Sequence, residues 1–194
     1  GDIEIVALGT LTNIALAMIK EPGIVPLMKS PVVMGGSGVG PGNVTPLAEA
    51  NIYGDPDAAQ IVLESGIKSV WVGFDACQGE AFYEGPDIEK IAALHTRASE
   101  FFLNCNQGLL AFHEAQGHRG LSMPDPAAMA IAIWPDMEAE GADAYVEAEC
   151  SRGICRAALV VDLKNEAKNP LNGHCVFKLD VKRFKEEIYR LFSL

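Results

Sequence analysis

The stretch PVVMGGSGVGPG, residues 31–42, is the most informative about the fold. Its first four residues are apolar and include two valines, which is typical of a short strand buried on both faces. The strand runs directly into glycines, which allow the backbone to turn tightly. In open α/β sheets, ligands bind at the carboxyl ends of the strands. We therefore expect an α/β fold with a binding site beside this loop.

Similar elements lie on either side of this stretch. Residues 3–8 (IEIVAL) are apolar at nearly every position and predict a central, buried parallel strand. Residues 11–19 place apolar side chains on one helical face, and residues 57–65 predict a helix capped by Asp55. Residues 68–74 (KSVWVGF) predict the next strand. This alternation of strand and helix indicates a mostly parallel sheet with flanking helices.

The second half of the chain is expected to be richer in helix. The expected elements are helical residues 86–114, a helix capped by Asp125 and Pro126 that runs to residue 133, strands at 145–148, 157–161 and 176–179, and a helix capped by Asp180 that runs to residue 192. No repeat or linker divides the sequence, so we expect one domain over residues 1–194. Because the chain enters a strand directly after Gly1, we expect its natural beginning, with further N-terminal strands, to lie upstream.

The composition is that of a folded protein, with 49% hydrophobic and 21% charged residues among 194. A formal net charge of -11 repels phosphate backbones and anionic headgroups, so we expect neither nucleic acid nor a membrane surface as a partner. No apolar run reaches the ~18 residues that span a bilayer. The five cysteines lack metal or redox spacing. We therefore expect a cytoplasmic protein with reduced thiols.

Polar side chains are concentrated just after the glycine-rich loop. Asn43, Thr45, Glu49 and Asn51 follow the strand of residues 31–34. Amide and carboxylate groups offer donors and acceptors that suit the hydroxyl groups of a sugar. The alternative is a connection in which these side chains satisfy the turns of the loop itself. The residues alone leave both interpretations open.

This segment belongs to a longer run that resembles a known family. The most specific part is GNVTPLAEANIYGDPDAA at residues 42–59, and GTLTNIALA at 9–17, VVMGG at 32–36, VGFD at 72–75 and PDPAAMA at 124–130 support it. Together they are similar to the inosine-uridine-type nucleoside hydrolases, over most of the chain. The resemblance implies a nucleoside-hydrolase-like fold with a Rossmann-like core. It also implies an N-ribohydrolase that cleaves purine or pyrimidine ribonucleosides to base and ribose.

By position, the resemblance implies four residues that contact the substrate. Asn43, Glu49 and Asn51 match the ribose-contacting residues of the family, and Met34 matches a residue that lines the sugar pocket. Cleaving an N-glycosidic bond gives the ribose oxocarbenium character. Hydroxyl contacts that strengthen in that transition state lower the barrier.

The resemblance also implies a calcium ion. Asp125 matches an aspartate that the family uses both at calcium and near the ribose, and Leu8 matches a position whose backbone carbonyl ligates the metal. Calcium takes about six to eight oxygen ligands, so these two groups are too few. The family motif DxDPGxDD, which supplies most of the calcium carboxylates and the general base, is absent from these residues. We expect it upstream.

The leaving base needs a proton donor or an aromatic partner. Many relatives carry histidine immediately before the aspartate, and purine-specific ones carry an aromatic residue, but this chain has Pro124. Proline can neither donate a proton nor stack in the same way. His113 and His118 are the candidate leaving-group acids, because histidine titrates near neutral pH. The alternative is that both are surface or structural residues.

Other polar residues have simpler interpretations. Cys77 is expected to pack as a small buried residue rather than act as a nucleophile. Asp57, like Asp55, stands where a carboxylate favours the start of a helix. The acidic run at 136–143 is expected to be a solvated face.

Two functions follow from these features. The first is a ribonucleoside hydrolase whose activity also needs the N-terminal half. The second is a non-catalytic remnant of the same fold that binds a nucleoside or ribose, or assembles with another subunit. An exposed strand edge at residues 3–8 would invite pairing, so we expect a homo-oligomer or a missing partner segment.

Overall fold

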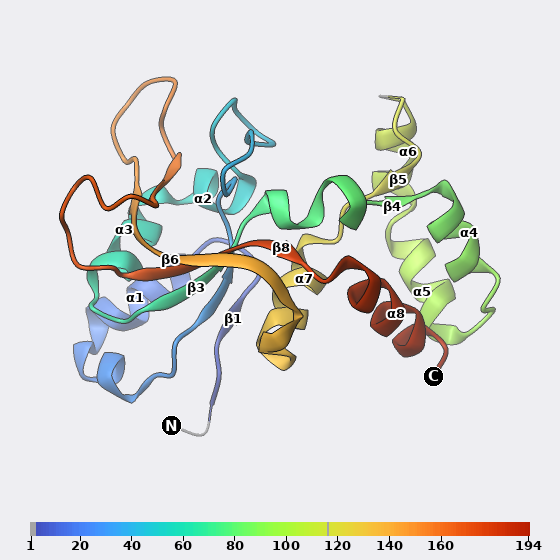
Figure 1. Ribbon diagram of the computed structural model, residues 1–194, viewed down its shortest axis with the longest axis horizontal. Coiled ribbons are helices and arrows are strands. Elements are labelled where there is room, and N and C mark those ends of the chain that lie inside the picture. The colour runs from blue at the N-terminus through green and yellow to red at the C-terminus, as the bar shows by residue number, and fades with distance from the viewer. Residues whose placement is uncertain (1–2, 116) are drawn as a thin grey trace.

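The computed structural model describes residues 3–115 and 117–194 and shows a central sheet between helices (Figure 1). The strands of the main sheet are β1 (Val6–Ala7), β2 (Val32–Met34), β3 (Ser69–Val72), β6 (Glu138–Ala148), β7 (Leu159–Asp162) and β8 (Gly173–Leu179). A separate two-stranded ribbon consists of β4 (Tyr83–Glu84) and β5 (Gly120–Leu121).

The main sheet has the order β1-β2-β3-β8-β6-β7. The strands β1, β2, β3 and β8 run parallel, whereas β6 pairs antiparallel with both β8 and β7. Val70 of β3 stands opposite Val32 on one side and His174 on the other. The mostly parallel α/β sheet predicted from the sequence is confirmed.

The helices are α1 (Thr12–Lys20), α2 (Ala50–Gly54), α3 (Pro56–Glu64), α4 (Gly85–Ala92), α5 (Arg97–Cys105), α6 (Gln107–Ala115), α7 (Pro124–Ile133) and α8 (Val181–Phe192). Short 3-10 helices are η1 (Pro22–Leu27), η2 (Phe74–Cys77), η3 (Gly79–Ala81) and η4 (Pro135–Met137). The predicted caps at Asp55 and Asp180 are confirmed, since each carboxylate accepts an N–H from the first turn of its helix.

Alternation along the strands divides the core between the two faces of the sheet. Val33, Trp71 and Cys175 pack with α1 and α3 on one face. On the other face Val72 and Val176 pack with α7 and the helical half. This arrangement fixes the carboxyl ends of β1, β2 and β3 between two layers of helices.

The helical half differs from the single long stretch expected at 86–114. Figure 1 shows α4, α5 and α6 as separate helices, of which α4 and α5 lie near α8. The chain breaks at His95, whose φ of 51° is left-handed, and Thr96 then caps α5 through its side chain. Asp87 links this half to α8 by accepting hydrogen bonds from Lys185 and Tyr189.

The strand expected at residues 3–8 is shorter, since β1 covers only Val6–Ala7. Among the described residues it is not central but lies at the edge of the sheet and pairs only with β2, which leaves the exposed edge that was also expected. Ile3 is 78% exposed as a result. The acidic run at 136–143 is solvated as expected, with the side chains of Asp136, Glu140 and Asp143 76%, 57% and 45% exposed. Residues 138–143 also form the first half of β6 and pair with β8.

Two general expectations can be compared with this fold. All five cysteines are free thiols. Within residues 3–115 and 117–194, the helices are each too short or too polar to cross a membrane.

Candidate active site

Residues assigned to the sugar and the metal meet at one end of the sheet. Leu8 follows β1 directly, and Met34 is the last residue of β2. Helix α7 contacts both strands, and Asp125 lies in its first turn. The carboxyl ends of two parallel strands and the N-terminus of a helix therefore frame the candidate site, as expected for an α/β sheet.

Asn51 joins the ends of the two strands. Its amide nitrogen Nδ2 lies 3.0 Å from the backbone oxygen of Met34, 3.2 Å from Met34 Sδ and 3.5 Å from the backbone oxygen of Leu8. These contacts use the donor side of the amide. The side-chain oxygen is the group that suits a hydroxyl donor on a ligand.

Asn43 and Thr45 stabilise the loop itself. Asn43 Oδ1 accepts the N–H of Ala50 at 3.0 Å, and Thr45 Oγ1 accepts the N–H of Ala48 at 3.0 Å. Both contacts are of the kind that satisfies a turn. These two side chains therefore satisfy the turns of the loop, which was the alternative interpretation of the sequence. The ribose contact of Asn43 stays a prediction.

Glu49 is buried, with only 2% of its surface exposed. Its Oε1 accepts the N–H of Asn51 at 2.9 Å, and Oε2 accepts those of Gly36 at 3.1 Å and Ile52 at 3.4 Å. The carboxylate thus caps α2 and holds the glycine-rich loop. Burial raises the pKa of Glu49, the hydrogen bonds oppose this, and the charge of Asp125 adds to the rise.

Asp125 does not cap α7 as the sequence had suggested. The N-cap is Met123, with no side-chain hydrogen bond, and the helix begins at Pro124. Prolines at 124 and 126 lack N–H groups, so the first turn offers few donors to a capping carboxylate. Partial burial raises the pKa of Asp125. Its charge contributes to the raised pKa of Glu49.

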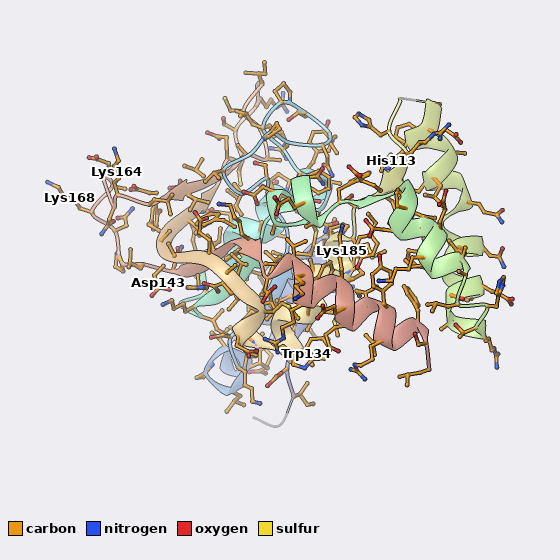
Figure 2. The ribbon with its side chains drawn as sticks, turned by 45° about the vertical axis from the view of Figure 1, so that its right-hand side comes forward. His113, Trp134, Asp143, Lys164, Lys168 and Lys185 are labelled. Carbon is orange, nitrogen blue, oxygen red and sulfur yellow. The ribbon has the colours of Figure 1, made fainter. Side chains whose placement is uncertain are left out.

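His113 and His118 lie in the helical half (Figure 2 labels His113 on α6). The Nδ1–H of His113 donates to the backbone oxygen of Gly120 at 2.8 Å, so Nε2 is the ring nitrogen left for a ligand. Both histidines line a cavity of about 330 Å³ with Phe74, Phe82, Glu84, Gln78, Gly79 and Ser122. Asp125 does not line this cavity, although Ser122 is only three residues away in sequence.

The described residues do not complete a calcium site. Asp125 and the Leu8 carbonyl supply two oxygen donors, against the about six to eight that calcium takes. Within residues 3–115 and 117–194, no three His, Cys, Asp or Glu side chains come together as a metal-binding group. Any full coordination shell would need further oxygens.

A cavity of about 630 Å³ is lined by other residues than those of this site. It is bordered by residues of η2, η3, β6 and β8, including Asp75, Glu140 and Lys178. We do not assign it to the nucleoside, because Leu8, Met34, Asn51 and Asp125 are not among its lining residues. In the sequence, Asp75 was noted only as the last residue of the motif VGFD at residues 72–75.

Cys77 has the packing role expected from the sequence. Its side chain is buried and its thiol donates to the backbone oxygen of Phe74 at 2.9 Å. Burial raises the pKa of this thiol to about 12, which keeps it protonated and poorly nucleophilic at neutral pH.

Comparison with known proteins identifies the family. Residues 1–186 match the model of the inosine-uridine preferring nucleoside hydrolases. The chain is 33% identical over 178 residues to a probable uridine nucleosidase 1 from Oryza sativa subsp. japonica, covering 90% of this chain and 54% of that protein. It is 34% identical over 186 residues to a pyrimidine-specific ribonucleoside hydrolase from Shigella flexneri serotype 5b, covering 95% of this chain and 58% of that protein. The chain thus spans little more than half the length of these curated relatives.

Solved structures agree with the sequence matches. A plant nucleoside hydrolase superposes with a TM-score of 0.90 at 27% identity, covering 99% of this chain and 62% of that chain. A purine-preferring ribonucleoside hydrolase from Gardnerella vaginalis superposes with a TM-score of 0.86 at 28% identity, covering 99% and 60% respectively. The family named from the motifs is confirmed. Because the family model matches nearly the whole sequence, this chain belongs to the inosine-uridine preferring nucleoside hydrolases.

Proposed function

We propose that this chain forms the ribose-contacting part of an N-ribohydrolase, which uses water to cleave purine or pyrimidine ribonucleosides to base and ribose. The supporting observation is the meeting of Leu8, Met34, Asn51 and Asp125 at the carboxyl ends of parallel strands. Membership of the family supports the same reaction class. Relatives named for pyrimidine and for purine substrates both match, so the proposal covers both bases.

The polar groups of this site suit a sugar. Asn51 presents an amide oxygen whose nitrogen is already fixed on Met34, so its orientation is set before a ligand arrives. Asp125, free of a capping role, can accept a ribose hydroxyl. As the ring gains oxocarbenium character, such hydrogen bonds strengthen and lower the barrier.

His113 and His118 are the proposed leaving-group acids, because both line the same cavity and could reach a base bound there. Phe82 lies 6.1 Å from the His113 ring and offers an apolar surface for a base. Replacing either histidine by glutamine should lower kcat for inosine. Nitrophenyl riboside has a leaving group that needs no proton, so the variants should hydrolyse it with the kcat of the wild type. Equal losses on both substrates would contradict the assignment.

Calcium is the proposed metal, with Asp125 and the Leu8 carbonyl among its ligands. The other oxygens would come from outside the described residues, and the aspartate-rich motif expected upstream would supply them. The chemistry that calcium brings is the holding of sugar diols and the orientation of a water. Metal titration of the chain and of a version extended upstream tests this. Tight binding by the extended version alone is the expected result.

Calorimetry with ribose and inosine, with and without calcium, tests the function itself. We expect weak ribose binding by this chain and hydrolysis by the version extended upstream. Asp125→Asn should weaken both ribose binding and hydrolysis. Asp57 is an exposed residue paired with Arg156, and Asp57→Asn should change neither ribose binding nor hydrolysis. An extended version that binds no nucleoside would end the hydrolase proposal.

The second candidate is a protein that binds ribose or a nucleoside without cleaving it, or serves subunit assembly. Two observations favour it: Pro124 occupies the position of a leaving-group histidine, and the described donors are too few for calcium. Nucleoside binding without release of base, measured by chromatography of the reaction mixture, would distinguish this candidate.

We also propose that the protein is cytoplasmic and forms a homo-oligomer. Oligomerisation is supported by the edge position of β1 and by Ile3, which is 78% exposed beside it. Light scattering of the purified chain should show a species larger than 20.7 kDa. A monodisperse monomer would count against the oligomer.

A further inference from the structure

Asp75 lies beneath the glycine-rich loop rather than in the sugar site. It belongs to η2, directly after the third parallel strand. Its Oδ2 accepts the backbone N–H of Val39 at 2.9 Å. Its Oδ1 is buried and makes no hydrogen bond among the described residues. The N-cap of η2 is Gly73, with no side-chain cap, so Asp75 does not serve as that cap.

Two glycines leave the room that this carboxylate occupies. A Cβ added to Gly38 would lie 2.1 Å from Asp75 Oδ1, and one added to Gly73 would lie 2.5 Å from it. Gly38 also has a φ of 66°, a conformation that side chains disfavour. The carboxylate and the two glycines therefore fit together closely, and the loop is shaped around Asp75.

The same loop holds Glu49. The carbonyl of Gly36 accepts the N–H of Phe74 at 2.8 Å, while the N–H of Gly36 donates to Glu49 Oε2 at 3.1 Å. Ser37, also buried, donates through Oγ to the backbone oxygen of Leu47 at 3.2 Å. Residues 36–39 are thus anchored on η2 at one side and hold the segment 47–49 at the other.

We propose that Asp75 is a positioning residue, which fixes residues 36–39 and, through Gly36, sets the orientation of Glu49 beside the sugar site. Its action passes through backbone hydrogen bonds and involves no contact with the substrate. The effect on ribose rests on the proposed function, whereas the effect on the loop does not. Burial raises the pKa of Asp75, which agrees with a carboxylate kept in place for its geometry.

The test compares Asp75→Ala with Asp75→Asn, which keeps an oxygen to accept from Val39. Glu80→Ala serves as control, because it removes an exposed carboxylate that borders the same large cavity. Amide hydrogen exchange is followed at Val39, at Gly36 and at Val70 in the sheet. Calorimetry with ribose gives the affinity. Exchange at Val70 reports whether each variant remains folded.

For Asp75→Ala we expect exchange to rise about tenfold or more at both Val39 and Gly36, with ribose affinity reduced about tenfold. Asp75→Asn and Glu80→Ala should stay within about twofold of the wild type. Faster exchange at Val39 alone, with Gly36 and ribose affinity unchanged, would overturn the proposal. So would an Asp75→Asn variant as impaired as Asp75→Ala.

Two further outcomes remain decisive. If the wild-type chain binds no ribose, the proposed function is contradicted, and exchange at Gly36 still decides the positioning role. If Asp75→Ala fails to fold, the Asp75→Asn variant decides: wild-type exchange at Gly36 supports the hydrogen-bond role, and fast exchange overturns it.

Discussion

The side-chain amide of Asn51 donates to the backbone oxygen of Met34 at 3.0 Å, and thereby attaches the start of α2 to the end of β2. The contact crosses the glycine-rich loop, because the two residues lie on either side of it in sequence. It explains how a loop with few apolar side chains can return to the sheet at a fixed place. The sugar site depends on this closure as much as on the chemistry of its side chains.

Asn51→Asp should destabilise the protein more than Asn51→Ala. Alanine removes a hydrogen bond, at about 1 kcal/mol, whereas aspartate places a carboxylate against the carbonyl oxygens of Met34 and Leu8, at about 2–3 kcal/mol. Urea unfolding measures both free energies. Equal losses in the two variants would mean that the amide donor does not hold the strand ends.

Glu49→Gln should also lower stability, by about 1–3 kcal/mol. The carboxylate accepts three backbone N–H groups, and an amide cannot present an acceptor at both of its ends. Thermal unfolding measures the loss. Glu89→Gln makes the same chemical change at an exposed position on α4, serves as the control, and should leave the stability unchanged. A Glu49→Gln variant as stable as the wild type would contradict the capping role.

The stability contributed by His174 should fall as the pH rises. Its Nδ1 lies 2.7 Å from Asp143 and its Nε2 lies 2.8 Å from Glu138, so both ring nitrogens donate when the ring is protonated. Burial lowers the pKa of His174, but the hydrogen bonds to Asp143 and Glu138 outweigh it and raise the pKa above 6.5. The contribution is therefore complete below the unfolded pKa and is lost as pH passes the folded pKa.

Replacing His174 by glutamine tests this dependence. The difference in Tm between wild type and variant should be larger at about pH 6 than at about pH 9. Lys68, which also pairs with Asp143, is present in both proteins. An equal difference in Tm at the two pH values would show that the charge of His174 contributes nothing to the stability of the protein.

Asp87→Ala should loosen the helical half from α8. Asp87 accepts from Lys185 Nζ at 2.8 Å and from the Tyr189 hydroxyl at 2.6 Å, and these partners lie about a hundred residues away. Figure 2 shows Lys185 on α8. We expect a loss of about 1–3 kcal/mol, measured by urea unfolding. Asp136→Ala, which removes an exposed partner of Arg183, should leave the midpoint unchanged.

Much of the fold could be predicted from local sequence. The strands at β2 and β3 are apolar on both faces and the caps at Asp55 and Asp180 are short-range signals, so no tertiary information was needed. The order in which the strands pair could not be predicted in the same way. An apolar run indicates burial, but which strand pairs with which depends on contacts across the whole chain.

The structure brings several of the predicted site residues together, and the roles given to them stay predictions. The motifs placed Asn51 and Asp125 in one region, which the structure supports through Leu8, Met34 and Glu49. They did not show that Glu49 is bound by three backbone N–H groups. Such contacts depend on the path of the loop, which glycines leave undetermined in sequence. Asp75 was missed because its significance lies in Gly38 and Gly73, which only folding brings against it.

The position of β8 has a consequence for biosynthesis. This strand follows β6 and β7 in sequence, yet it lies between β3 and β6 in the sheet. Synthesis must therefore reach residue 179 before β3 and β6 gain their shared neighbour. Until then each of these two strands has one unpaired edge, and an unpaired edge can pair wrongly with another chain.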